Sequence, residues 1–172
     1  LRLELLGGKL HFKKQVALLA GLCLSCAGSF QLPQGNLGTG QVYWHSFRNG
    51  LTNSAYIERD YPPAQVLAWR FKAGGAITAT PLLRGNTVIF GTSEKKLYFV
   101  DSRTGLKVGQ LSLPGQVATT PGLKDDILYL GTAKNKKLYA LNYLKGTVVW
   151  ESKIGEVSSP PVVSGSRLLV GT

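Results

Sequence analysis

The chain of 172 residues is 44% hydrophobic and 17% charged, and its formal net charge at pH 7 is +11. An apolar share this large excludes an intrinsically disordered polymer. The 21 Gly and 8 Pro residues favour many short strands joined by tight turns over a helical bundle. The sequence holds no Met and ends at Thr172 inside a predicted strand, so we expect a piece of a longer protein.

Residues 1–26 have the three-part pattern of a secretory signal peptide. Residues 9–14 are basic, residues 16–24 are apolar, and small residues follow from Ser25. The apolar run is too short to span a bilayer, which takes about 20 residues. A buried core helix is the alternative interpretation of the same run. The signal predicts export, with residues 27–65 as a lead-in segment.

Two cysteines lie at the end of this predicted signal, and the rest of the chain has none. The segment Cys23-Leu-Ser-Cys26 resembles a bacterial lipobox, which implies lipidation of Cys26 and a tether on the periplasmic side of a membrane. Alternatively, an ordinary signal peptidase cuts at the small residues Ser25 to Ala27 and removes both cysteines. Neither interpretation leaves a disulfide framework or a CxxC pair in the mature part.

A forty-residue repeat follows the lead-in. It is marked by three prolines and three Gly-Thr pairs, at Pro81, Pro121, Pro161, Gly91, Gly131 and Gly171. The first copy predicts four strands, near 76–83, 87–92, 96–101 and 106–113, separated by turn residues. Four strands per forty residues are typical of a β-propeller blade. A β-sandwich, the alternative, leaves the ungapped three-fold match unexplained.

The repeat predicts an all-β fold of four-stranded antiparallel blades in residues 66–172. About two and a half blades are present, with repeats near 76–113, 116–154 and 157–172. We expect Trp69 to lie on a strand near 66–72, as the outermost strand of the last blade, which closes the ring. Trp69, Tyr98, Tyr139 and Trp150 are expected to belong to the core between blades rather than to a ligand site.

One segment resembles a known family closely. Leu138-Tyr-Ala-Leu-Asn142 followed by Lys145-Gly-Thr-Val-Val-Trp150 resembles the PQQ-type propeller repeat, whose hallmarks are Leu-Tyr-Ala-Leu-Asp, a Thr-Gly turn and an outer-strand Trp. The segment from Trp44 to Gly50 resembles the stretch that commonly precedes the first blade of that family. The sequence departs from the family pattern at Tyr143-Leu144, a longer turn, and at Gln110, which replaces a Trp. The repeat positions with a structural role also include Gly105 and Gly146.

The chain offers little catalytic chemistry in its mature part. His45 is the one histidine after the signal, so neither a zinc site nor a His-paired nucleophile is supported. Five lysines at equivalent hairpins of adjacent blades predict a basic rim that binds a partner: Lys95, Lys96, Lys134, Lys136 and Lys137. Alternatively, these lysines are solvated and protect strand edges from pairing.

Three functions remain open from the sequence. The resemblance implies an exported, non-catalytic interaction scaffold that binds other envelope proteins and needs no cofactor, as in the lipoprotein of the outer-membrane β-barrel assembly machinery. The alternative is part of a quinoprotein dehydrogenase, which binds pyrroloquinoline quinone and calcium, although no catalytic Asp or quinone-stacking Trp can be matched. A ligand-sensing propeller is the third. Nucleic acid is not an expected partner for an exported chain, despite its basic charge.

Overall fold

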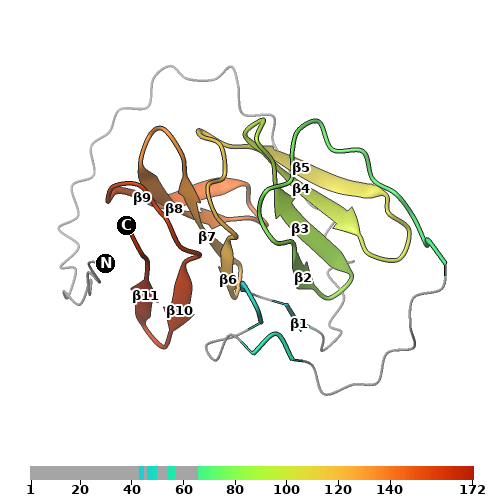
Figure 1. Ribbon diagram of the computed structural model, residues 1–172, viewed down its shortest axis with the longest axis horizontal. Coiled ribbons are helices and arrows are strands. Elements are labelled where there is room, and N and C mark those ends of the chain that lie inside the picture. Colours follow the sequence, from blue (N-terminus) through green and yellow to red (C-terminus); the bar gives the residue numbers. More distant parts are fainter. Residues whose placement is uncertain (1–42, 45, 50–53, 57–65) are drawn as a thin grey trace.

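The computed structural model of the chain describes residues 43–44, 46–49, 54–56 and 66–172. The predicted signal peptide, with Cys26, and His45 in the lead-in lie outside these residues. The described residues form three antiparallel sheets, set side by side along the chain (Figure 1). The all-β fold of propeller blades is thereby confirmed.

The first sheet is built by the first repeat together with a short strand from the lead-in. Its strands, in spatial order, are β1 (Tyr43–Trp44), β2 (Leu82–Arg84), β3 (Thr87–Gly91), β4 (Lys96–Asp101) and β5 (Lys107–Ser112). The last four correspond to the four strands that the first repeat predicts. The first of them begins at Leu82 rather than near residue 76, because residues 76–81 form no strand. The pairing of β1 with β2 was not part of the sequence prediction, which treated this segment only as a lead-in.

The second and third sheets follow the same meander. The second contains β6 (Gly122–Lys124), β7 (Ile127–Thr132), β8 (Lys137–Asn142) and β9 (Thr147–Lys153). The third contains β10 (Val162–Ser164) and β11 (Arg167–Leu169). We call the three sheets blades 1, 2 and 3.

Each blade repeats the same local irregularities. The residue after the first strand has a positive φ in all three copies, at Gly85, Asp125 and Gly165. This conformation suits a tight hairpin turn and costs a glycine little. A register shift also recurs at equivalent points, after Phe99 in β4 and after Ala140 in β8. Such bulges increase strand twist, so both blades twist at the same place.

The core lies mainly between blades 1 and 2. Alternate side chains of β4 point to opposite faces of the sheet, as the two-residue period of a strand requires. Leu97 and Phe99 pack in the cluster shared with blade 2, while Tyr98 and Val100 pack on the other face. A central blade strand is therefore buried on both sides, which explains its nearly continuous apolar sequence.

The repeated glycines Gly91 and Gly131 allow one blade to approach the next. A Cβ atom at Gly91 would lie 2.5 Å from Cγ2 of Val117, and one at Gly131 would lie 2.5 Å from Cβ of Val157. Both valines belong to the segments that link consecutive blades, and both are buried. Ile77 holds the equivalent place before blade 1, where it is 47% exposed.

In blades 1 and 2, a basic side chain at the end of the first strand reaches across to the next blade. Arg84 Nη1 donates hydrogen bonds to the Asp125 carbonyl and to the Tyr143 hydroxyl, and it lies 3.2 Å from the Asp126 carboxylate. Forty residues later, Lys124 Nζ donates to the Gly165 carbonyl over 2.5 Å. A hydrogen bond from an equivalent basic side chain thus joins blade 1 to blade 2 and blade 2 to blade 3.

The segment before blade 1 differs from the prediction in one respect. Residues 66–72 do not form a strand in the structure, because a strand requires a hydrogen-bonded neighbour and no described strand pairs with them. The segment nevertheless lies against blade 1. Trp69 Nε1 donates to the Ser102 carbonyl over 2.7 Å, its ring covers Gly105, and Phe71 packs edge-on against Phe90 and Tyr98. The segment thus packs on the face of blade 1 that carries Tyr98. Blade 1 packs on the equivalent face of blade 2, which carries Tyr139.

Candidate partner-binding pocket

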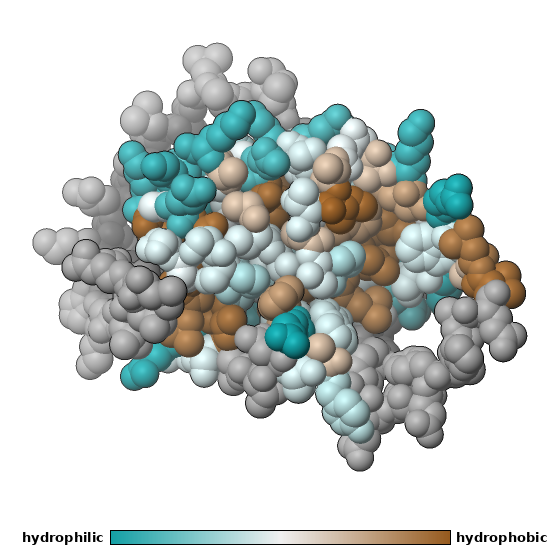
Figure 2. Space-filling model, in the orientation of Figure 1, coloured by the Kyte–Doolittle hydropathy of each residue, from teal (hydrophilic) through white to brown (hydrophobic). Residues whose placement is uncertain are grey.

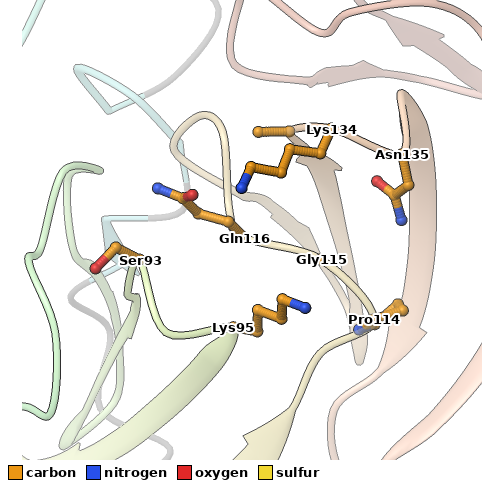
Figure 3. Close-up of a pocket in the computed structure, with 8 residues that line it drawn as sticks. Ser93, Lys95, Pro114, Gly115, Gln116, Lys134 and Asn135 are labelled. Carbon is orange, nitrogen blue, oxygen red and sulfur yellow. The ribbon is translucent and has the colours of Figure 1, made fainter.

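A pocket of about 410 Å³ opens where blade 1 meets blade 2. Three segments line it: the β3–β4 hairpin loop, the link between the blades, and the β7–β8 hairpin loop (Figure 3). The lining residues are Ser93, Lys95, Pro114, Gly115, Gln116, Ala133, Lys134 and Asn135. The pocket therefore belongs to the junction of the two blades rather than to either blade alone.

Backbone hydrogen bonds hold the three walls together. Leu113 N donates to the Lys95 carbonyl over 2.7 Å and ties the link to the first hairpin loop. Ala133 N donates to the Gln116 carbonyl over 2.9 Å and ties the second hairpin loop to the link. Gly115 fits closely under Asn135, because a Cβ atom there would lie 3.1 Å from Asn135 Oδ1. The pocket is preformed, so a ligand would not have to order its walls.

The structure brings two of the five predicted rim lysines into this pocket. Lys95 and Lys134 enter from opposite sides of the hollow (Figure 3). Both residues have a positive φ, 60° and 66°, at the turns of their hairpins. Among the described residues, neither ammonium group has an ion-pair or hydrogen-bond partner.

The other three lysines have different surroundings. Lys137 pairs with Glu151 across the β8–β9 pair, and this hydrogen bond raises the pKa of Lys137 above its ordinary value. Lys96 begins β4 and is half-buried, while Lys136 is exposed on the β7–β8 loop outside the pocket. Of the five lysines predicted to form a basic rim, the structure therefore places Lys95 and Lys134 in the pocket, and partner binding by the rim stays a prediction.

Sequence reasoning missed the residues of the link, Pro114 to Gln116. Their position between two predicted blades was a signal, because the strands of the first repeat end near 113 and those of the second begin near 116. Links and hairpin loops at equivalent ends of antiparallel strands come to the same edge of the sheets. In the orientation of Figure 1 the hairpin loops lie at the top, and Figure 2 shows hydrophilic residues along this upper edge of the molecule.

The aromatic positions expected in the core divide into two groups. Tyr98 and Tyr139 are buried, and Trp69 is half-buried against blade 1. Trp150 differs from the expectation, because it is 39% exposed and contacts Tyr129 with ring centroids 6.1 Å apart. The reason is that β9 is exposed along its whole length, since the described part of blade 3 has only two strands and does not cover it.

The carboxylates that could be considered for chemistry have local roles. Asp101 Oδ1 accepts hydrogen bonds from the backbone N–H groups of Thr104 and Arg103, each over 2.9 Å. These bonds lower the pKa of Asp101 below its ordinary value. In the part of the chain that the structure describes, no three His, Cys, Asp or Glu side chains lie close enough to hold a metal ion. No helix in that part is long and apolar enough to cross a membrane.

The blades, their forty-residue period and the Leu-Tyr-Ala-Leu segment together define a β-propeller of the PQQ-like repeat class. The family model described as "Outer membrane protein assembly factor BamB" matches residues 36–172. The chain belongs to this family.

Two solved structures show the same fold. BamB from Moraxella catarrhalis is similar with a TM-score of 0.51 and 23% sequence identity, over 60% of this chain and 33% of that chain. Quinohemoprotein alcohol dehydrogenase from Comamonas testosteroni is similar with a TM-score of 0.60 and 19% identity, over 75% of this chain and 23% of that chain.

A sequence relative belongs to the second kind of propeller. Quinoprotein alcohol dehydrogenase PedH of Pseudomonas putida is 28% identical in an alignment of 122 residues, and the match covers 60% of this chain and 20% of that protein. The chain therefore spans a third or less of the length of these relatives.

Proposed function

We propose that the chain is part of an exported, non-catalytic propeller that acts as a scaffold in outer-membrane protein assembly. The main support is the match of residues 36–172 to the family model described as an outer membrane protein assembly factor. The preformed pocket between blades 1 and 2 supports it, because two unpaired lysines at a junction of loops suit the binding of another envelope protein.

The proposal is tested in the bacterium that carries the gene. We expect deletion of the gene to lower the abundance of β-barrel proteins in the outer membrane, because a scaffold of their assembly has been removed. Quantitative mass spectrometry of isolated outer membranes measures this, with the full-length gene restored on a plasmid as the control. Unchanged β-barrel protein levels in the deletion strain would rule the role out.

A second candidate is part of a quinoprotein dehydrogenase, favoured by the match to PedH and by the similarity to the Comamonas enzyme. The full-length protein distinguishes the two functions directly. A scaffold should neither retain pyrroloquinoline quinone after incubation with the quinone and Ca²⁺ nor oxidise alcohols. Stoichiometric quinone binding, seen by absorbance after gel filtration, together with alcohol-dependent dye reduction, would establish the dehydrogenase instead.

A lipid on Cys26 would tether this scaffold to the periplasmic side of a membrane. Cys26 lies outside the described residues, so this part of the proposal depends on the lipobox-like segment alone. In cells fed an alkyne fatty acid, the full-length protein should become labelled. Cys26→Ala should abolish the label, whereas Cys23→Ala should retain it. A wild-type protein that takes up no label would refute the anchor.

A further inference from the structure

The pocket between blades 1 and 2 contains two ammonium groups and no carboxylate. Lys95 comes from blade 1 and Lys134 from blade 2, and none of the eight lining residues is Asp or Glu. Two like charges that face one hollow repel each other. An anion placed between them replaces this repulsion with two attractions. The electrostatics of the pocket therefore favour an anionic occupant.

The nearest acidic residue in the sequence does not neutralise the pocket. Glu94 lies between Ser93 and Lys95, but its side chain is turned toward the segment before blade 1. A Cβ atom at Gly74 would lie 2.7 Å from Glu94 Oε2, and one at Gly75 would lie 2.8 Å from Glu94 Cγ. Glu94 accordingly does not line the pocket, which remains positively charged.

The polar groups of the pocket divide into those that build it and those left for a ligand. Ser93 Oγ accepts a hydrogen bond from Ala76 N, and the Asn135 amide is held between Thr132 Oγ1 and the Tyr139 hydroxyl. The Gln116 side chain has no hydrogen-bond partner among the described residues. It points from the link toward the Ser93 side of the hollow (Figure 3). Two ammonium groups and one amide thus remain to donate hydrogen bonds.

The next junction along the chain differs in charge at the corresponding link position. Forty residues after Gln116, the link between blades 2 and 3 carries Glu156, and it follows β9, whose Glu151 already pairs with Lys137. The link position is therefore neutral at the first junction and acidic at the second.

The rim of the pocket helps to identify the source of the anion. A site for a membrane surface combines basic residues with exposed aromatic or large aliphatic side chains that enter the lipid. The lining here consists of Ser, Lys, Pro, Gly, Gln, Ala and Asn. This composition favours a carboxylate presented by a soluble segment over a lipid headgroup in a bilayer.

We propose that this pocket binds an acidic, extended segment of a partner protein. Its Asp or Glu carboxylates pair with Lys95 and Lys134, and the Gln116 amide donates a hydrogen bond to the same segment. The inference rests on the proposed scaffold function and adds the chemistry of the partner and the place where it binds.

The test measures binding of a fluorescent peptide of alternating Glu and Ser to the full-length protein by fluorescence polarisation. Lys95→Gln and Lys134→Gln should each weaken binding about two- to fivefold, and the double variant about tenfold or more, because each removes one partly solvated ion pair. Gln116→Glu should weaken binding as much as the double variant, because it places in the pocket the carboxylate that the next junction carries. High salt should weaken wild-type binding.

Three controls keep the inference falsifiable. Lys136→Gln removes the same charge from the same loop outside the pocket, and binding should stay within about twofold of wild type. A peptide with Gln in place of Glu should not bind. Any binding of phosphatidylglycerol vesicles should be the same for the wild type and for the double variant of Lys95 and Lys134. Thermal melting, as a separate check on folding, should show that all variants remain folded, since the three lysines are exposed and Gln116 is only half-buried.

Several results would overturn the inference. They are wild-type affinity in the double variant, equal binding of the Gln peptide, an equal loss in Lys136→Gln, or lysine-dependent binding of vesicles without binding of the peptide. Failure here is distinct from failure of the scaffold function, because peptide binding by the pure protein does not depend on outer-membrane assembly in cells.

Discussion

Replacing Tyr143 by Ala is expected to lower the free energy of unfolding by about 3 to 5 kcal/mol. Tyr143 is 0% exposed and stacks on Phe99 of blade 1, with ring centroids 5.9 Å apart and ring planes inclined by 20°. The guanidinium carbon of Arg84 lies 5.4 Å from the centre of the same ring, and Arg84 Nη1 donates to the hydroxyl. Truncation leaves a cavity between the blades and removes the aromatic partner of Arg84.

Two further variants separate the contributions of ring and hydroxyl. Tyr143→Phe keeps the ring and should cost about 1 kcal/mol, the usual net value of one hydrogen bond. Tyr56→Ala removes an aromatic side chain that is 69% exposed, and its effect should stay within about 0.5 kcal/mol. Urea unfolding of the full-length protein, followed by tryptophan fluorescence, measures all three. A loss for Tyr143→Ala no larger than that for Tyr56→Ala would contradict the packing described here.

Tyr143 also shows where sequence reasoning stops. The sequence prediction treats Tyr143-Leu144 as a longer turn that departs from the family pattern, and the first repeat carries Ser102-Arg103 at the same place. The burial of Tyr143 depends on Phe99 and Arg84, which belong to another blade. A comparison between repeats detects residues that recur, whereas a contact made once between two particular blades gives no such signal.

The strands were predictable for the opposite reason. Turn residues, β-forming residues and the forty-residue period are local or recurrent signals, so the four predicted strands of the first repeat agree with β2 to β5 at most of their ends. The segment near Trp69 has the same β-forming composition but forms no strand. A strand requires a hydrogen-bonded neighbour, and composition does not reveal whether one is present.

The candidate site was predictable in part. Equivalent hairpins place their loops on one edge of neighbouring blades, so the gathering of Lys95 and Lys134 followed from the repeat. The pairing of Lys137 with Glu151 depends on the register of β8 against β9, which includes a bulge that the sequence does not show. Gln116 lines the pocket because of the path that the link takes between the blades. The link has no strand pattern, so the sequence does not predict this path.

Replacing Gly91 by Ala is expected to destabilise the protein by about 2 to 3 kcal/mol. The added methyl carbon would lie 2.5 Å from Cγ2 and 2.8 Å from Cβ of Val117, closer than nonbonded carbons approach. Val117 is buried in a link whose neighbour Ala118 donates a backbone hydrogen bond to Gly131 O over 2.9 Å. The link therefore cannot move away without breaking contacts between blades 1 and 2.

A double-mutant cycle isolates this contact. Val117→Ala removes the two crowding methyl groups, so combining it with Gly91→Ala should recover about 1 kcal/mol relative to the sum of the single losses. Gly74→Ala is the matched control, because the atom nearest its new methyl carbon is the end of the flexible Glu94 side chain, and its loss should stay below about 0.5 kcal/mol. Urea midpoints and melting temperatures of the full-length variants measure the cycle. Strictly additive losses, or a Gly91→Ala variant as stable as Gly74→Ala, would show that close approach of the link does not require glycine at this position.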